Sequence, residues 1–354
     1  MGFFWHRRKL VRMNTKIYQL NQIDEAAAAI QRGELVAFPT ETVYGLGADA
    51  TNEPAVKNVY LAKGRPSDNP LIVHVNSVAM VEKYAAEIPA NARKLMAAFW
   101  PGSLTIILKI KKGALSKTVT GGLSTVAFRF PDNQPTLDLI GKAGVPIVGP
   151  SANTSGKPSP TTAQHVYHDL NGKITGILDD GPTRVGVEST VLDMSTATPV
   201  ILRPGAVTKQ DIEGVIGSID LNHHKVGKNE TPKAPGMKYK HYAPSAQVYI
   251  VDEGTDWAQV AKWVAQQPFD VGVMAEERIL QQLTLPMNAV QFSLGTGVED
   301  ASARLFDGLR GFDDQPNVKA RVTEAFTAKN LGRAYMNRLN KSAGGVHFDP
   351  AQVK

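Results

Sequence analysis

Residues 35–49 read Leu-Val-Ala-Phe-Pro-Thr-Glu-Thr-Val-Tyr-Gly-Leu-Gly-Ala-Asp, a short apolar run that becomes polar at Pro39. The apolar part, residues 35–38, predicts a buried strand. Open α/β sheets bind their ligands where strands end, so the polar part, residues 39–49, is a candidate site. An ordinary turn capped by hydroxyl groups fits these residues equally well.

The alternation of β-rich runs with helical segments continues through the first 205 residues. Strands are predicted at residues 35–38, 71–75, 104–110, 126–130, 146–148, 174–178, 190–192 and 200–202, and helices at 24–31, 53–62 and 90–99. This pattern predicts an α/β domain built on one large mixed sheet.

A second, smaller part follows a polar and turn-rich stretch. Its predicted strands at residues 248–251, 271–274 and 289–292 alternate with predicted helices at 257–266, 301–309 and 334–341, as in a parallel α/β domain. It contains neither a G-x-G-x-x-G nor a G-x-x-x-x-G-K-[ST] motif. We therefore expect a first domain at residues 13–215, a linker at 216–244 and a second domain at 245–354.

Composition excludes several classes of protein. The chain has 354 residues, 42% of them hydrophobic and 20% charged, which is typical of soluble globular proteins. It has no cysteine, which excludes disulfide scaffolds, thiolate metal sites and a cysteine nucleophile. Because no apolar run reaches the roughly 20 residues of a membrane span, we expect a cytoplasmic protein without membrane contact.

The first twelve residues carry four positive charges, and the net charge of the whole chain is +6. We expect residues 1–12 to be a disordered extension with no part in the fold. The net charge is therefore weak support for RNA binding, since charge acts on association more than on fold.

A second polar cluster begins at the end of a predicted helix. Gly64 is expected to stop that helix and Pro66 to hold Arg65 extended, so Lys63 and Arg65 project from a stiff loop. Two such cations suit a polyphosphate, but they also suit the dipole at a helix end. His74 alternates with apolar residues on the following strand, where a histidine is more often part of the core than a ligand contact.

Two further clusters follow predicted strands. Arg129 shares the small-residue face of its strand with Thr125 and is placed to bind a carboxylate or phosphate, unless that face is simply exposed. Residues 149–161 form a loop rich in hydroxyl and amide groups, which is either a binding loop or a surface turn. Downstream, residues 187–190 and 202–205 add hydroxyl groups and an arginine at strand boundaries.

No G-x-S-x-G elbow and no H-E-x-x-H or other metal-ligand spacing is present in the sequence. The candidate residues are cations and neutral hydrogen-bond donors. Such a set favours catalysis by positioning and charge stabilisation over a covalent enzyme intermediate.

Five motifs of the first part resemble the YrdC-like domain of the Sua5/YciO/YrdC family. In chain order they are P-T-E-T-V-Y-G-L-G-A-D, K-G-R-P-x-x-N-P-L-I-V-H, S-A-N-x-S-G-x-P-S-P-T, V-E-S-T-V and L-R-P-G. The linker motif A-P-G-M-K-Y-K-H-Y-A-P and the extra α/β domain resemble the longer Sua5 subgroup. Six motifs in the right order make the resemblance specific, and it extends from Met13 to the C-terminus. It implies a YrdC-like twisted mixed sheet with helices and a smaller Rossmann-like Sua5 domain.

The resemblance implies an enzyme, a nucleotidyltransferase that converts L-threonine, bicarbonate or CO₂, and ATP into L-threonylcarbamoyl-adenylate, pyrophosphate and water. This is the first step in making the t6A modification at position 37 of tRNA. Mg²⁺ is expected with the ATP phosphates, without metal ligands from the protein, and no prosthetic group is implied. The implied partners are a downstream threonylcarbamoyl-transferase complex and, through a weak contact, tRNA.

The resemblance also implies roles for individual residues. Lys63 and Arg65 are the catalytic pair, which offsets charge on the phosphates. Threonine is expected to contact Thr42, His74, Arg129, Ser151 and Ser189, with Arg129 gripping its carboxylate. ATP is expected to contact Lys63, Arg65, Asn69, Thr125, Asn153, Thr161, Arg203 and Tyr242. Thr40 and Tyr44 shape the pocket, and linker residues 233–244 are expected to act as a lid.

Two other functions compete with this interpretation. A non-enzymatic RNA-binding module is suggested by a basic C-terminal stretch that contains Lys329, Arg333, Arg338 and Lys341, although a solvated helix face explains it as well. A carbamoyltransferase related to the hydrogenase-maturation protein also contains a YrdC-like domain. That protein carries cysteine-rich zinc fingers, which a chain without cysteine lacks.

Overall fold

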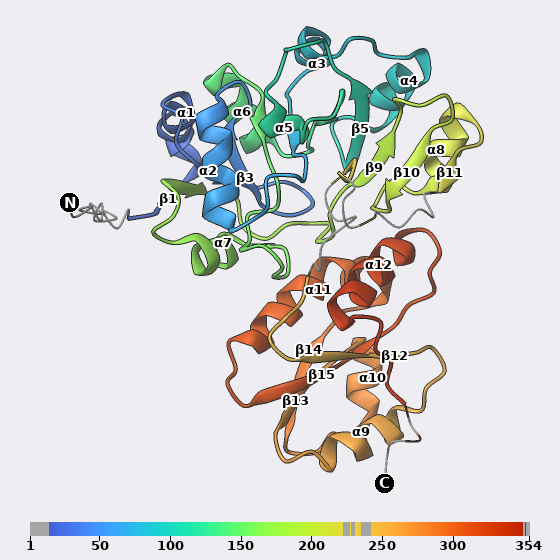
Figure 1. The fold of residues 1–354 in the computed structure, drawn as a ribbon. Coiled ribbons are helices and arrows are strands. Elements are labelled where there is room, and N and C mark those ends of the chain that lie inside the picture. The colour runs from blue at the N-terminus through green and yellow to red at the C-terminus, as the bar shows by residue number, and fades with distance from the viewer. Residues whose placement is uncertain (1–13, 222–226, 228–230, 235–241, 350, 352–354) are drawn as a thin grey trace, which may run out of the picture.

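The computed structural model describes residues 14–221, 227, 231–234, 242–349 and 351, and all structural statements below concern these residues. They form two α/β parts, each built on its own sheet (Figure 1). The expected N-terminal extension and residues 235–241 of the expected lid lie outside the described residues.

The first sheet contains eleven strands in the described part of the chain. In the order in which they lie side by side they are β1 (Lys16–Tyr18), β8 (Gly176–Leu178), β2 (Val36–Phe38), β3 (Gly45–Asp49), β7 (Ile147–Val148), β4 (Ile72–His74), β6 (Thr125–Arg129), β5 (Leu104–Lys109), β9 (Thr190–Asp193), β10 (Val200–Arg203) and β11 (Asp220–Leu221). Parallel pairs such as β4–β6 lie beside antiparallel pairs such as β5–β6. The predicted mixed sheet is confirmed.

Helices cover this sheet (Figure 1). They are α1 (Ile23–Gln31), α2 (Glu53–Lys63), α3 (Val78–Tyr84), α4 (Ala90–Phe99), α5 (Lys117–Thr120), α6 (Gln134–Ala143), α7 (Ala163–Leu170) and α8 (Lys209–Ile216), with a short 3-10 turn at η1 (Leu20–Gln22). The ends of α2 follow local chemistry, since the Asn52 side chain accepts a hydrogen bond from the N–H of Ala55, and Gly64 ends the helix with φ of 62°. The helix end predicted at Gly64 is confirmed.

Three strands of this sheet, β1, β3 and β11, were not predicted, and β3 has a clear physical reason. The sequence of β3, Gly-Leu-Gly-Ala-Asp, has low strand propensity because of the glycines. A Cβ atom on Gly47 would lie 2.6 Å from the carbonyl oxygen of Val36, and one on Gly45 would lie 2.7 Å from the Phe38 ring. Close packing against β2 therefore requires glycine at these positions, and the same glycines lower the strand propensity of the segment.

The second sheet contains four strands within the described residues, and all of its pairs are parallel, as predicted. Its strands lie in the order β12 (Gln247–Val251), β15 (Val318–Glu324), β13 (Asp270–Ala275) and β14 (Ala289–Ser293). Its helices are α9 (Trp257–Ala265), α10 (Glu277–Gln282), α11 (Gly297–Asp313) and α12 (Leu331–Ala343).

Strand β15 lies inside this sheet but was not predicted, because charged residues interrupt its apolar pattern. One of them, Arg321, has no exposed surface. Its guanidinium donates to the Asp313 carboxylate at 2.5 Å and to the carbonyl oxygen of Ala246 at 3.0 Å. The buried charge is thus paired, and the strand tolerates it.

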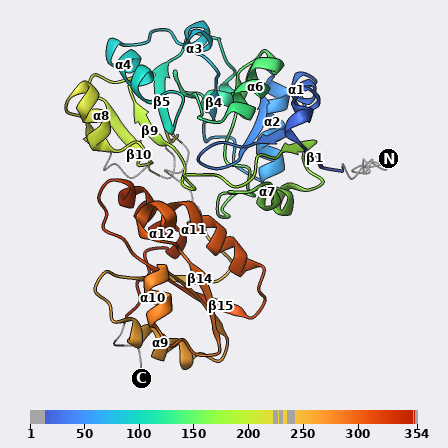
Figure 2. The same cartoon turned by 180° about the vertical axis from the view of Figure 1, so that it is seen from behind.

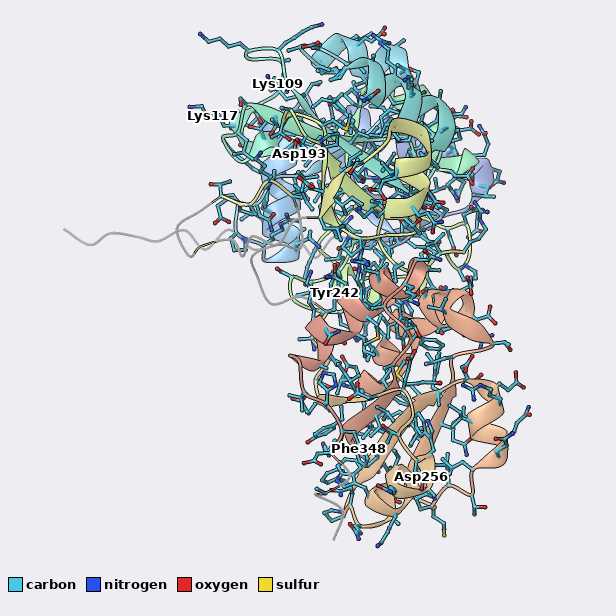
Figure 3. The ribbon with its side chains drawn as sticks, turned by 90° about the vertical axis from the view of Figure 1, so that its right-hand side faces the viewer. Lys109, Lys117, Asp193, Tyr242, Asp256 and Phe348 are labelled. Carbon is cyan, nitrogen blue, oxygen red and sulfur yellow. The ribbon has the colours of Figure 1, made fainter. Side chains whose placement is uncertain are left out.

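The two parts meet through α11 and α12, which face the first part in both cartoon views (Figures 1 and 2). Val43 and Tyr242 pack into the same apolar cluster as residues of α11 and α12. In Figure 3, Tyr242 is labelled at this junction. The apolar contact between the two parts therefore extends to the loop that follows β2.

Candidate active site

A pocket lies near the junction, where strands β4, β6, β7 and β10 end. Eight of the side chains expected to bind substrates line it: Arg65, His74, Arg129, Ser151, Asn153, Ser189, Arg203 and Tyr242. The other lining residues are Val43, Ile72, Gly149, Pro150, Lys157, Ser159 and Glu188. Five of the quoted sequence motifs, the strand that carries Arg129 and the end of the linker thus converge on one cavity.

Arg129, at the end of β6, is buried. Its guanidinium forms an ion pair with Glu41 at 2.7 Å and donates to the Thr42 hydroxyl at 2.8 Å. Glu41 also accepts hydrogen bonds from the Ser103 hydroxyl at 2.8 Å and from the N–H of Asp132 at 3.2 Å. The interpretation of Arg129 as an ordinary surface residue is wrong, because the residue is fixed inside the pocket wall.

Lys63 is the last residue of α2 and is also buried. Its ammonium group donates to the carbonyl oxygens of Ser151 at 2.5 Å and Asn153 at 2.6 Å, so it binds the loop after β7. Burial lowers the pKa of Lys63 well below its usual value, and repulsion from Arg65 lowers it further. Arg65 donates to the carbonyl oxygen of Asn69 at 3.2 Å.

His74 is buried at the end of β4, and its ring packs edge-on against Phe38. Burial lowers the pKa of His74 well below its usual value, with a further contribution from the charge of Arg129. The imidazole is therefore neutral at physiological pH. Its Nδ1 atom has no hydrogen-bond partner among the described residues, and the residue lines the pocket, so it combines the predicted core position with access to a ligand.

The loop after β7 is held by its own polar groups. The Ser151 hydroxyl donates to Asn153 Oδ1 at 2.6 Å, and the Asn153 amide donates to the carbonyl oxygens of Thr154 and Lys157 at 2.8 and 3.0 Å. These bonds, together with its place in the pocket lining, favour a binding loop over a surface turn.

Arg203 lies at the end of β10 and is buried. Its guanidinium donates to the carbonyl oxygen of Ser189 at 3.1 and 3.0 Å and to the Ser189 hydroxyl at 3.2 Å. Burial lowers the pKa of Arg203 to about 10, so the group stays protonated at neutral pH. These partners are neutral oxygen atoms, whereas Arg129 also forms an ion pair with a carboxylate.

Tyr242 closes one side of the pocket. It adopts a left-handed backbone conformation with φ of 61°, and its ring packs against Phe306 of α11 with centroids 5.1 Å apart. Burial raises the pKa of Tyr242 to about 12, with a contribution from Glu188, with which it forms a hydrogen bond. Its phenol is therefore neutral.

The remaining predicted site residues lie outside the pocket lining. Lys63 and Thr42 contact lining residues directly, as described above. Asn69 is buried, and both polar atoms of its side-chain amide are without a partner among the described residues, which is uncommon for a buried amide. Thr161 contacts His165 at 3.3 Å, and Thr125 begins β6 at the strand end opposite Arg129.

Thr40 and Tyr44, the expected pocket-shaping residues, do not line the pocket but form hydrogen bonds with the segments behind it. The Thr40 hydroxyl donates to the carbonyl oxygen of Val43 at 2.7 Å and lies 2.8 Å from the Thr42 hydroxyl. The Tyr44 hydroxyl donates to the carbonyl oxygen of Gly181 at 2.7 Å, and burial raises its pKa above the usual value.

Sequence reasoning gave no role to two acidic residues of the site, Glu41 and Glu188. Both lie within the quoted motifs, each next to hydroxyl residues at a strand boundary. A carboxylate at such a position was the feature of the sequence that could have indicated a role in the site. Each is bound to an arginine, Glu41 to Arg129 and Glu188 to Arg338. Their engagement leaves neither carboxylate suited to hold a metal, and the described residues contain no group of three or more potential metal ligands.

Two family profiles match the chain. The profile Sua5_yciO_yrdC, described as "Telomere recombination", matches residues 28–205. The profile described as "Threonylcarbamoyl-AMP synthase, C-terminal domain" matches residues 207–344. Together they cover both parts of the structure.

Relatives of similar length include two proteins called threonylcarbamoyl-AMP synthase. The one from Bacillus subtilis is 48% identical over 329 residues, which cover 92% of this chain and 93% of the relative. The one from Pyrococcus abyssi is 47% identical over 326 residues, which cover 90% of this chain and 93% of the relative. A crystal structure of P. abyssi Sua5 complexed with L-threonine superposes with a TM-score of 0.86 at 44% identity, over 95% of this chain and 99% of that chain.

Proposed function

The chain belongs to the Sua5 family of threonylcarbamoyl-AMP synthases, and we propose that it converts L-threonine, bicarbonate and ATP into L-threonylcarbamoyl-AMP, pyrophosphate and water. It is a nucleotidyltransferase, since the adenylyl group of ATP is transferred to a carboxylate oxygen. The observation that carries the proposal is the convergence of Arg129, Arg203 and neutral polar groups on one pocket, which suits two anionic substrates.

Arg129 and Arg203 have different partners, and this difference suggests which substrate each one binds. Arg129 is already paired with Glu41, so the pair brings no net charge and suits a small zwitterion such as threonine. Arg203 donates to neutral oxygen atoms of Ser189, so it offers its charge to a polyphosphate. We assign Arg129 to threonine and Arg203 to ATP.

Threonine binds through its carboxylate to Arg129. Arg129 donates through Nη1 to the Thr42 hydroxyl and through Nε to the carbonyl oxygen of Gly102. Its Nη2 atom lies in the ion pair with Glu41 but forms no hydrogen bond with the described residues, so its N–H groups are open to a substrate carboxylate. Thr42, His74, Ser151 and Ser189 surround the rest of the amino acid, with neutral His74 as a hydrogen-bond acceptor.

ATP lies on the side of the pocket defined by Arg203 and Tyr242. Lys63 and Arg65 approach it from the end of α2, where they offset charge that develops on the phosphates. The unpartnered amide of Asn69 gains partners when a nucleotide is bound. The same assignment includes Thr125, Asn153 and Thr161, and it places Thr40 and Tyr44 in support of the wall.

The chemistry needs no covalent enzyme intermediate. The amine of threonine, once deprotonated, forms a C–N bond with the carbon of CO₂, or with that of bicarbonate as a C–O bond breaks and water leaves. The amine gives up one further proton, and the product is a carbamate. A carbamate oxygen then attacks the α-phosphorus of ATP, and the bond to pyrophosphate breaks. Mg²⁺ held by the ATP phosphates would neutralise part of their charge, beside the cations Lys63 and Arg65.

The product is a mixed anhydride that water can hydrolyse, so a transferase must consume it promptly. In the proposed role, that transferase passes the threonylcarbamoyl group to tRNA for the t6A modification.

No helix among the described residues is long and apolar enough to cross a membrane.

RNA binding through the basic C-terminal stretch has little structural support. Arg338 has no exposed surface and binds Glu188, so the stretch is not one solvated face. Burial lowers the pKa of Lys341 to about 8. Two of the four cations of that stretch are therefore engaged at the junction rather than displayed to a nucleic acid.

Pyrophosphate release tests the proposal. Release from ATP and Mg²⁺ is expected only when L-threonine and bicarbonate are both present, and Lys63→Ala is expected to abolish it. Lys57→Ala is the matched control, because this lysine lies on the same helix with an exposed side chain. Release that is indifferent to threonine would overturn the proposal.

A further inference from the structure

Among the side chains of the second part that reach the pocket wall of the first, Arg338 is fully buried. It lies on α12. Its Nε donates to Glu188 Oε2 at 2.9 Å, and Nη2 donates to the backbone carbonyl of Glu188 at 3.0 Å. Nη1 donates to the carbonyl oxygen of Pro204 at 2.6 Å, so one guanidinium joins two segments that both border the pocket.

Glu188, which Arg338 binds, forms hydrogen bonds with two other residues of the pocket lining. Its Oε1 accepts a hydrogen bond from the Ser159 hydroxyl at 2.5 Å, and it is hydrogen-bonded to Tyr242. Glu188, Ser159 and Tyr242 all line the pocket. Arg338 therefore acts on the pocket through Glu188 and does not line it.

The charges around Glu188 are balanced. Burial alone would raise its pKa, but Arg338 and then Arg203 hold it at about 2, so the group is a carboxylate at neutral pH. Lys341, also on α12, and the phenol of Tyr242 are the other titratable groups that interact with it. Without Arg338, Arg203 would become the main cation available to this buried carboxylate.

We propose that Arg338 is a positioning residue of the catalytic pocket: it holds the Glu188 carboxylate, which in turn fixes Tyr242 and leaves Arg203 to bind ATP. The inference rests on the proposed synthase function. It gives the C-terminal part a direct share in nucleotide binding, through one buried ion pair that crosses the junction.

Replacement of Arg338 by methionine in the full chain tests this role. The variant is expected to raise the KM for ATP about tenfold, equivalent to ~1.4 kcal/mol, while the KM for threonine changes by less than about twofold. In this variant Glu188 loses its main cation, so its pKa rises and its carboxylate draws Arg203 toward it. Protonation of Glu188 as the pH is lowered toward 5 is expected to release Arg203 and to bring the KM for ATP back toward the wild-type value. The double variant Arg338→Met/Glu188→Gln has no carboxylate to titrate, so its KM for ATP is expected to lack this dependence on pH.

Two further variants separate positioning from general damage. Arg333→Met removes a cation from an exposed position on the same helix and is expected to leave both KM values unchanged. Arg338→Lys keeps the charge but cannot reproduce all three hydrogen bonds, so an intermediate KM for ATP is expected. It provides the test if the methionine variant does not fold.

The outcomes are distinguishable. If the wild-type protein shows no release of pyrophosphate that depends on threonine and bicarbonate, the proposed function fails. If the wild-type protein is active and folded Arg338 variants keep the wild-type KM for ATP at every pH, the positioning role is wrong. Equal increases in both KM values would also contradict it, because they would indicate a general loss of pocket structure.

Discussion

Arg129 and Arg203 show how burial and partners give the same side chain two different tasks. Both are almost fully buried at strand ends, but Arg129 faces the Glu41 carboxylate whereas Arg203 faces the carbonyl and hydroxyl oxygens of Ser189. The arginine in direct contact with a carboxylate suits an amino acid, and the arginine hydrogen-bonded to neutral oxygen atoms suits phosphates. This difference makes the substrate assignment testable at single residues.

Replacement of Arg129 by lysine is expected to raise the KM for threonine by about 10- to 100-fold, equivalent to ~1.4–2.8 kcal/mol, with a much smaller change for ATP. Lysine cannot contact Glu41, Thr42 and a substrate carboxylate together, because its ammonium is a compact group without a planar fork. Pyrophosphate release measured against the concentration of each substrate gives both constants.

The control for this change is Arg93→Lys, because Arg93 is exposed and pairs with Glu82 on the surface. It is expected to leave both constants unchanged. A selective rise in the KM for ATP in the Arg129 variant would reverse the assignment of the two arginines.

At the scale of elements, β3 depends on glycines that leave no room for a side chain. A Cβ atom on Gly47 would lie 2.6 Å from a backbone oxygen of β2 and 3.1 Å from the Ile147 side chain of β7. Since backbone atoms cannot rotate away, β3 would have to move, and with it the loop that carries Glu41 and Thr42.

Gly47→Ala is therefore expected to lower the free energy of unfolding by about 1–3 kcal/mol. Gly214→Ala, in α8, has no atom within 4 Å of the new Cβ and is expected to raise stability by up to ~1 kcal/mol through helix propensity. Urea unfolding of both variants measures the contrast. Equal effects of the two changes would contradict the packing account of β3.

The strands that could be predicted are those whose signal is local. The apolar runs that became β2, β4, β5 and β6 appear in the sequence at nearly their observed bounds. Strands β3 and β15 could not be found this way, because close packing selects glycine in the first and a paired arginine occupies the second. Both signals become visible only when the neighbouring strand is known.

The same distinction holds for the site. Arg129 and Ser151 could be proposed from motifs, but the ion pair between Glu188 and Arg338 joins residues separated by 150 positions. The buried pair between Asp169 and Arg310 of α11 spans 141 positions. No periodicity or spacing reports such contacts, so the contribution of the second part to the pocket could not be predicted from the sequence.

At the scale of the whole molecule, the junction links stability to the ionisation of Glu188. The pKa of this group is lowered from 4.5 to about 2 in the folded protein. Its contribution is therefore complete above pH 4.5 and is lost as the pH falls from there toward 2. The full contribution is on the order of 3 kcal/mol.

Glu188→Gln is thus expected to be less stable than the wild-type protein at pH 6, with a gap that narrows as the pH falls to about 2. Urea unfolding at a series of pH values measures that gap. Glu299→Gln, at an exposed position of α11, serves as the control and is expected to show a small gap throughout. A stability difference between Glu188→Gln and the wild-type protein that stays constant with pH would contradict this account, because it would show that the junction contacts do not lower the pKa of Glu188.

Synthesis of threonylcarbamoyl-AMP by this chain can be observed in the product itself, by mass spectrometry. The full chain is incubated with ATP, Mg²⁺, L-threonine and ¹³C-bicarbonate. We predict a nucleotide with the mass of threonylcarbamoyl-AMP that carries the ¹³C label and disappears when threonine is omitted. Folded protein that yields no labelled nucleotide, or that only hydrolyses ATP, would contradict the account.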